Sequence, residues 1–199
     1  MNFKFIPQIV LFFFAMSVFV SCMPIDELFE KDNEGKISCI INGEPYEVEG
    51  GKSILSSEIL RSELTRREGH FLLTIYGIKP VEDNKGLAIG FRIGGIDVAD
   101  LKPDDVFTEW EVLDEEEGSF VGAMGGVEER TSGNTDYHEL KASSNHTGDI
   151  TLTISEIDTV GRLISGTFHF TAKDQISGDV QEVTDGVFEK IKWVEKGNT

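Results

Sequence analysis

Strict alternation of apolar and hydroxyl residues is the feature that most constrains the fold of this chain. In the segment 150–155, Ile, Thr, Leu, Thr, Ile and Ser follow one another, so every second side chain is apolar. Because side chains along a β-strand point alternately to opposite faces, this segment predicts a strand with one buried and one wet face. The same period recurs at 165–172, where Phe168, Phe170 and Ala172 share one face.

Similar strand-like segments, separated by turn signals, extend over most of the chain. We expect strands at 37–41, 46–48, 70–78, 87–93, 106–113, 120–123, 137–142, 149–157, 163–172 and 180–193. Among the expected turns are Asn42-Gly43, Gly125-Gly126 and Asp185-Gly186, and the first and last of these suit tight hairpins. The pattern predicts an all-β fold, namely an antiparallel β-sandwich, with an up-and-down β-barrel as the alternative. The spacing of the apolar residues within 53–67 is compatible with one short helix, and a strand there is the alternative.

The N-terminal apolar segment is too short to cross a bilayer as a helix. Residues 9–20 are uncharged, but they number 12, whereas about 20 are needed. Lys4 precedes them, and Ser21-Cys22 follows. This arrangement resembles a bacterial lipoprotein signal peptide, in which Cys22 is lipidated and becomes the mature N-terminus. Phe19 stands where the lipoprotein pattern normally has Leu, and an ordinary secretory signal is the alternative.

We therefore expect three parts: a signal peptide at 1–21, an acidic tether at 22–35 and a single β domain at 36–196. The tether contains Pro24 and shows no periodicity. Acidic residues just after the lipidated cysteine, here Asp26 and Glu27, resemble the export signal of Bacteroidota surface lipoproteins. The expected location is the outer membrane, with display at the cell surface and the periplasmic face as the alternative.

The charge of the chain argues against a nucleic-acid partner. Residues 1–21 contain one basic and no acidic residue, so the remainder has 17 basic and 36 acidic residues and a formal net charge of −19. Such a surface repels phosphates and anionic lipid headgroups, which leaves the lipid on Cys22 as the expected contact with the membrane. Once Cys22 is acylated, Cys39 is the remaining thiol. It shares a strand face with Ile37 and Ile41, so we expect it to be buried and inert.

Three short motifs resemble a group of uncharacterised Bacteroidota lipoproteins. They are an Asn-Gly pair followed by an aromatic residue at 42–46, Ser-Gly-Thr-Phe-x-Phe at 165–170, and Val-Thr-x-Gly-x-Phe at 183–188. The resemblance spans residues 37–193. It implies a one-domain β fold at the cell envelope, and it transfers no catalytic residue because the group has no assigned activity.

The residue pattern contains no recognisable catalytic, cofactor or metal motif. The four histidines are scattered, with no pair at the spacing of ligands on a helix. The acidic run 114–117 lacks the alternating carboxylates and glycine of a Ca²⁺ loop, so we interpret it as a solvated hairpin tip. We expect no enzyme activity and no cofactor.

Two residues are candidate surface sites. Trp110, if it is exposed, offers a ring on which a sugar or a partner can stack. Thr159 lies in Asp158-Thr159-Val160, which resembles the sequon that Bacteroidota O-glycosylate. The functional hypothesis is a lipid-anchored binding or interaction module with a glycan or protein partner. The alternatives are an envelope glycan hydrolase that uses a carboxylate pair, and a structural accessory subunit of a surface complex.

Overall fold

The structure is a computed structural model that describes residues 35–51, 58–67, 69–82, 85–114, 119–131 and 138–196. Within these ranges the chain forms β-strands and two short 3-10 turns, η1 (Val98–Asp100) and η2 (Ser144–His146), and no α-helix. The predicted signal peptide and nearly all of the predicted tether lie outside the described residues. In the part of the chain that is described, no helix has both the length and the apolarity to span a membrane.

The described residues contribute thirteen strands to one sheet. In chain order they are β1 (Lys36–Ile41), β2 (Glu44–Glu49), β3 (Ile59–Arg67), β4 (His70–Glu82), β5 (Lys85–Gly95), β6 (Val106–Phe107), β7 (Trp110–Asp114), β8 (Ser119–Thr131), β9 (His138–Ser143), β10 (Ile150–Asp158), β11 (Leu163–Asp174), β12 (Val180–Lys192) and β13 (Val194–Lys196). Neighbouring strands are antiparallel, except that β13 pairs with β3 in parallel.

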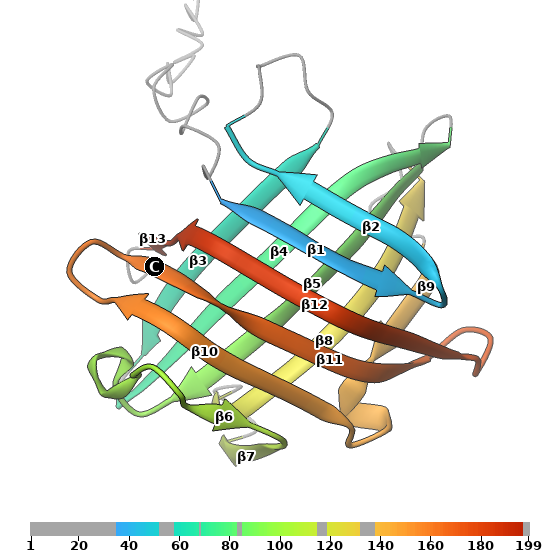
Figure 1. The fold of residues 1–199 in the computed structure, drawn as a ribbon. Coiled ribbons are helices and arrows are strands. Elements are labelled where there is room, and N and C mark those ends of the chain that lie inside the picture. The colour runs from blue at the N-terminus through green and yellow to red at the C-terminus, as the bar shows by residue number, and fades with distance from the viewer. Residues whose placement is uncertain are drawn as a thin grey trace, which may run out of the picture. The chain divides into compact units, whose positions relative to one another are not determined.

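The sheet folds over into two layers that cross one another obliquely. One layer contains β2, β1, β12, β11 and β10, and the other contains β3, β4, β5 and β8 (Figure 1). Strand β9 joins the layers, because it pairs with β8 along its length and with the end of β11. The sheet remains open, with β13 and β2 at its ends. The predicted all-β, sandwich-like fold is thus confirmed, and the barrel alternative is wrong.

The core lies between the two layers and is formed by the apolar faces of the alternating strands. In β11 every second residue from Ile164 to Ala172 is buried, as the period-two pattern predicts. Aromatic rings fill the centre of the core. The ring of Phe91 in β5 lies 5.1 Å from that of Phe168 and 4.8 Å from that of Phe188, between centroids. These contacts tie the two layers together through tilted ring packing.

The predicted turns fall into two groups. Asn42 and Gly43 have φ values of +51° and +86° and close the β1–β2 hairpin, as expected. The pair Asp185-Gly186, expected in a hairpin turn, lies inside β12 instead. There the register of β12 against both β1 and β11 shifts, and Asp185 with φ +51° forms a β-bulge. The prediction was wrong because a positive-φ residue serves a bulge as well as a turn.

Gly125 and Gly126, also expected in a turn, lie in the middle of β8. A Cβ on Gly125 would fall against the ring of Phe170, so the glycine makes room for a core aromatic residue. The single strand expected at 106–113 is divided into β6 and β7, which pair with β10 and β8 respectively. Residues 59–67 form β3 rather than part of a helix, and they pair with β4 over their whole length. Residues 52–57 lie outside the described part.

Candidate functional site

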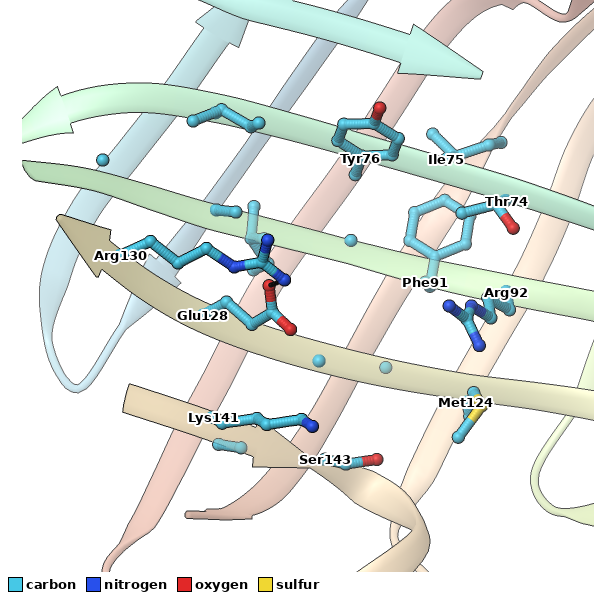
Figure 2. Close-up of a pocket in the computed structure, with 18 of the residues that line it drawn as sticks. Thr74, Ile75, Tyr76, Phe91, Arg92, Met124, Glu128, Arg130, Lys141 and Ser143 are labelled. Carbon is cyan, nitrogen blue, oxygen red and sulfur yellow. Dashed lines mark ion pairs between the residues drawn. The ribbon is translucent and has the colours of Figure 1, made fainter. Parts of the chain in front are cut away.

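The outer face of β4, β5, β8 and β9 is hollowed into a groove of about 950 Å³. Side chains on this face alternate with core side chains such as Ile75 and Val127, so the groove lies on the side of the layer opposite the core. Figure 2 shows Tyr76 on β4, Arg92 on β5 and Met124 on β8 among the side chains that line the groove. The groove is open to solvent and spans all four strands.

A row of four residues across the strands forms the floor of the groove. Tyr76 pairs with Gly90, Gly90 with Gly126, and Gly126 with Ser143. The two central positions of this row have no side chain. The row is therefore a trough that runs across the strands from the ring of Tyr76 to the hydroxyl of Ser143.

The two glycines of the floor differ in how much space their surroundings leave for a side chain. A Cβ on Gly90 would lie 2.5 Å from the carbonyl oxygen of Ile75 and 2.7 Å from the Cβ of Tyr76, so packing requires a glycine there. A Cβ on Gly126 would meet only the carbonyl oxygen of Ala142, at 3.2 Å, and the φ of Gly126 is not positive. The contact at Gly126 is tight but much less severe than at Gly90, and the glycine leaves the floor open.

Two further rows flank the trough. On one side Arg92 pairs with Thr74 and with Met124. On the other side the row runs through Ile78, Ala88, Glu128 and Lys141. Both Arg92 and Lys141 are exposed, and they lie on opposite sides of the trough.

The cations around the groove differ in how they are paired. Arg130 donates to Glu128 at 2.9 Å, which Figure 2 marks as an ion pair. Lys85 contacts Glu139 at 2.5 Å and Glu129 at 3.5 Å. The hydrogen bond that Lys85 donates to Glu139, aided by Glu129, raises the pKa of Lys85 above its ordinary value.

Arg92 and Lys141 differ from Arg130 and Lys85 in their pairing. Neither side chain has an ion-pair partner among the residues that the structure describes. A guanidinium and an ammonium that face solvent beside a groove are available to a ligand.

A buried carboxylate fixes the backbone of the strand that carries Lys141. Asp174, at the end of β11, is 3% exposed. Its Oδ1 accepts the backbone N–H of Lys141 at 2.9 Å, and its Oδ2 accepts the N–H and the hydroxyl of Ser177 at 3.0 and 2.7 Å. Burial by itself raises the pKa of Asp174, but these hydrogen bonds outweigh it and lower the pKa to about 2.

Two residues of η2 complete this end of the groove. Ser144 is 1% exposed, and its hydroxyl accepts the backbone N–H of Gly125 at 2.9 Å, which ties η2 to β8. Asn145 lines the groove, and its side-chain oxygen Oδ1 is buried without a hydrogen-bond partner among the described residues. Such an orphaned acceptor is unusual in a folded chain.

The sequence-predicted surface residues lie elsewhere. Trp110, at the start of β7, is half-buried and meets the ring of Phe120 edge-on at 5.4 Å between centroids, and it does not line the groove. Thr159 is exposed in the turn between β10 and β11, where Asp158 Oδ1 accepts the N–H of Val160 at 3.0 Å. Its modification stays a prediction.

Of the other residues that the sequence analysis considered, some lie within the described ranges and some lie outside them. Cys22 lies outside the described part, as do residues 115–117 of the acidic run. Cys39 is buried, and burial raises the pKa of its thiol to about 12, although Lys79 lowers it slightly. Within the described ranges, no group of three or more His, Cys, Asp or Glu is placed to hold a metal ion.

Sequence reasoning did not find the groove. A signal was present in the segment 86–91, where Gly86, Ala88 and Gly90 alternate with the larger Leu87, Ile89 and Phe91. In a strand this period places the small residues on one face, which here is the groove face.

Comparison with known proteins adds one family match. Residues 115–192 match the family model "Domain of unknown function (DUF6252)". The matched stretch contains β8 to β12, and so it includes Gly126, Glu128 and Lys141 of the groove. No curated protein and no solved structure gave a match. The expected resemblance to an uncharacterised group is thus supported at the level of a domain of unknown function, and its lipoprotein and Bacteroidota aspects stay predictions.

Proposed function

We propose that this chain is a lipid-anchored, non-catalytic binding module of the cell envelope, and that its groove binds a glycan. The observation that carries the proposal is the trough floored by Gly90 and Gly126 on the outer face of an otherwise ordinary sheet layer. A concave site with a few well-placed polar groups is the usual form of a small-ligand site.

The surroundings of the trough favour a sugar chain over a peptide. Three of the four strands under the groove are paired on both sides: β4 with β3 and β5, β5 with β4 and β8, and β8 with β5 and β9. Strand β9 pairs with β8 along its length and with β11 through Ala142 and Ser143. An extended peptide that adds to a sheet needs a free strand edge, which the groove does not offer along these pairings. The ring of Tyr76 and the hydroxyls of Thr74 and Ser143 offer a flat apolar surface and hydrogen-bonding groups instead.

The same groove gives little support to the hydrolase alternative. Glycoside hydrolysis by the common mechanisms requires two carboxyl groups on either side of the scissile bond. Among the described residues that line the groove, Glu128 is the only carboxylate, and it is ion-paired with Arg130 at 2.9 Å. We therefore propose binding without cleavage.

The location of the module follows from the N-terminal sequence. The apolar segment that ends at Cys22, followed by the acidic stretch 26–34, supports export and attachment through lipid on Cys22, with display at the cell surface. On this proposal the lipid holds the β domain at the membrane while the groove engages glycan.

Affinity gel electrophoresis of the full chain in gels that contain soluble polysaccharides tests the proposal. We expect at least one of dextran, xylan, methyl-esterified polygalacturonate and polygalacturonate to retard the wild type. Ala88→Leu and Gly126→Leu should abolish the retardation, because the first places a large apolar side chain beside the trough and the second places one in it. Ala88 already has a Cβ, so the first variant avoids any backbone clash.

Thr167→Leu is the matched control, since Thr167 is exposed on β11 in the other layer. It should bind as the wild type does. Retardation that survives both groove variants, or its absence with every polysaccharide, contradicts the proposal. Release of new reducing ends from a bound glycan contradicts the non-catalytic part of it.

A further inference from the structure

We infer that the groove is specific for an anionic glycan, one that carries uronic-acid carboxylates, and that Arg92 and Lys141 recognise these carboxylates. This inference rests on the proposed function and specifies its ligand. Four observations carry it: the local sign of the charge, the placement of the two cations, the range of the surrounding negative charge, and the unpaired acceptor in the groove.

The charge of the groove is opposite to that of the chain. The full sequence has 36 acidic and 18 basic residues and a net charge of −18. Along the described lining of the groove, Arg130 and Glu128 neutralise one another, while Arg92 and Lys141 have no ion-pair partner among the described residues. Two available cations in a strongly acidic chain indicate an anionic ligand by charge complementarity.

The placement of the two cations suits a polymer better than a small anion. Arg92 and Lys141 lie one row to either side of the Tyr76–Ser143 trough, on β5 and on β9. From strand spacing and rise, their Cα atoms are about 16 Å apart. A chain with repeated carboxylates that lies in the trough can contact each cation in turn, whereas a single carboxylate contacts both only if the two long side chains extend toward one another over the trough.

The negative charge of the remaining surface does not prevent this contact at physiological salt. The Debye length there is about 8 Å, so acidic groups farther away are largely screened while Arg92 and Lys141 act at contact distance. A guanidinium also binds a carboxylate through two parallel N–H···O hydrogen bonds, which gives geometric preference as well as attraction.

The unpaired acceptor of Asn145 points to a ligand with hydroxyl groups. Its Oδ1 lacks a partner among the described residues, and the residue lines the groove. The terminal torsion of an asparagine has a broad energy profile, so a small rotation offers this oxygen to a donor in the groove. A ligand that supplies both hydroxyl donors and carboxylates satisfies Asn145 together with the two cations, and a uronic-acid glycan has both.

Calorimetric titration of the full chain with polygalacturonate, with fully methyl-esterified polygalacturonate and with poly-glutamate tests the inference. The first two probes share a sugar backbone and differ in charge, and the third has carboxylates on a peptide. We expect polygalacturonate to bind at least tenfold more tightly than the other two. Arg92→Gln and Lys141→Gln should each weaken this binding about tenfold and bring it close to the affinity for the methyl ester.

Lys102→Gln is the control, because it removes the same charge from an exposed residue that does not line the groove. Equal binding of the acid and the methyl ester, lost in Ala88→Leu, overturns the anionic specificity and leaves the proposed function standing. Tighter binding of poly-glutamate overturns the choice of a glycan. Failure of every glycan to bind overturns the proposed function itself.

Discussion

The carboxylate of Asp174, in the layer of β11, accepts the backbone N–H of Lys141 in β9 at 2.9 Å. The backbone makes a reciprocal link, since the N–H of Gln175 donates to the carbonyl oxygen of Lys141 at 2.9 Å. Strand β9 forms one wall of the groove and also joins the two layers. The buried Asp174 and the turn that follows it therefore fix the backbone from which Lys141 extends.

We predict that Asp174→Ala lowers the free energy of unfolding by about 1–3 kcal/mol. The substitution leaves the N–H groups of Lys141 and Ser177 without their acceptor in a partly buried setting, and a loss of about this size is usual for an unmade hydrogen bond. Urea unfolding followed by tryptophan fluorescence measures it, because Trp193 is 2% exposed in the folded chain. Asp179→Ala is the control, since Asp179 is exposed and its effect should stay within about 0.5 kcal/mol.

The same carboxylate makes stability depend on pH. Its pKa is lowered from 3.8 to about 2 in the folded chain. A group with a depressed folded pKa stabilises above its unfolded pKa, and this contribution is lost as the pH falls from about 4 to about 2. The wild type should therefore lose more stability over this interval than Asp174→Asn does. Parallel urea midpoints for the two proteins between pH 5 and 2 would falsify this assignment.

A third prediction concerns Gly166 in β11. A Cβ there would fall against the carbonyl oxygen of Thr153 and lie 2.5 Å from the ring of Phe188. We expect Gly166→Ala to destabilise the chain by about 1–3 kcal/mol through overpacking. In Gly86→Ala the new Cβ meets Ile78 at 3.4 Å, so its effect should stay within about 0.5 kcal/mol. Similar thermal midpoints for the two variants contradict the packing argument.

A fourth prediction concerns the thiol of Cys39. Burial raises its pKa to about 12, so at pH 8 it is both protonated and shielded, and only the thiolate reacts. In the Cys22→Ala variant, an aromatic disulfide reagent should label no thiol in the folded chain and one thiol after unfolding in urea. Fast labelling of the folded protein contradicts the buried position.

A fifth prediction tests the lipid anchor. Cells that express the wild type and are fed labelled palmitate should yield a labelled protein, whereas Cys22→Ala should yield none. Globomycin should cause the unprocessed precursor of the wild type to accumulate, because it blocks the lipoprotein signal peptidase. Unchanged processing together with an unlabelled wild type contradicts the lipoprotein interpretation. Cys39→Ala serves as the control and should retain the label.

Much of the fold could be predicted from the sequence, because alternation reports which face of a strand is buried. Strand β3 was expected only as the alternative to a helix, because Ser62 occupies a core-facing position between Leu60 and Leu64 and breaks the apolar period. Strand β8 was predicted too short, since Gly125 and Gly126 are typical of turns. Here the first of them makes room for the ring of Phe170.

The candidate site could not be predicted from the sequence, for a different reason. Its floor depends on the pairing of β5 with β8, and these strands are separated along the chain by η1, β6 and β7. Periodicity shows that Gly90 and Gly126 lie in strand-like segments but does not show that they pair. The sequence indicated Trp110 because a large aromatic ring is a typical stacking surface. The groove depends instead on two glycines, which have no side chain.

Strand β1, which begins next to the predicted tether, is held on both sides and so resists a pull along its length. It lies between β2 and β12 and pairs with both (Figure 1). A pull on residue 35 along the strand loads the hydrogen bonds of both ladders in shear, so they resist together rather than opening one by one as they would at a peeled edge. On this geometry, a force that enters the domain at residue 35 is shared between two neighbouring strands.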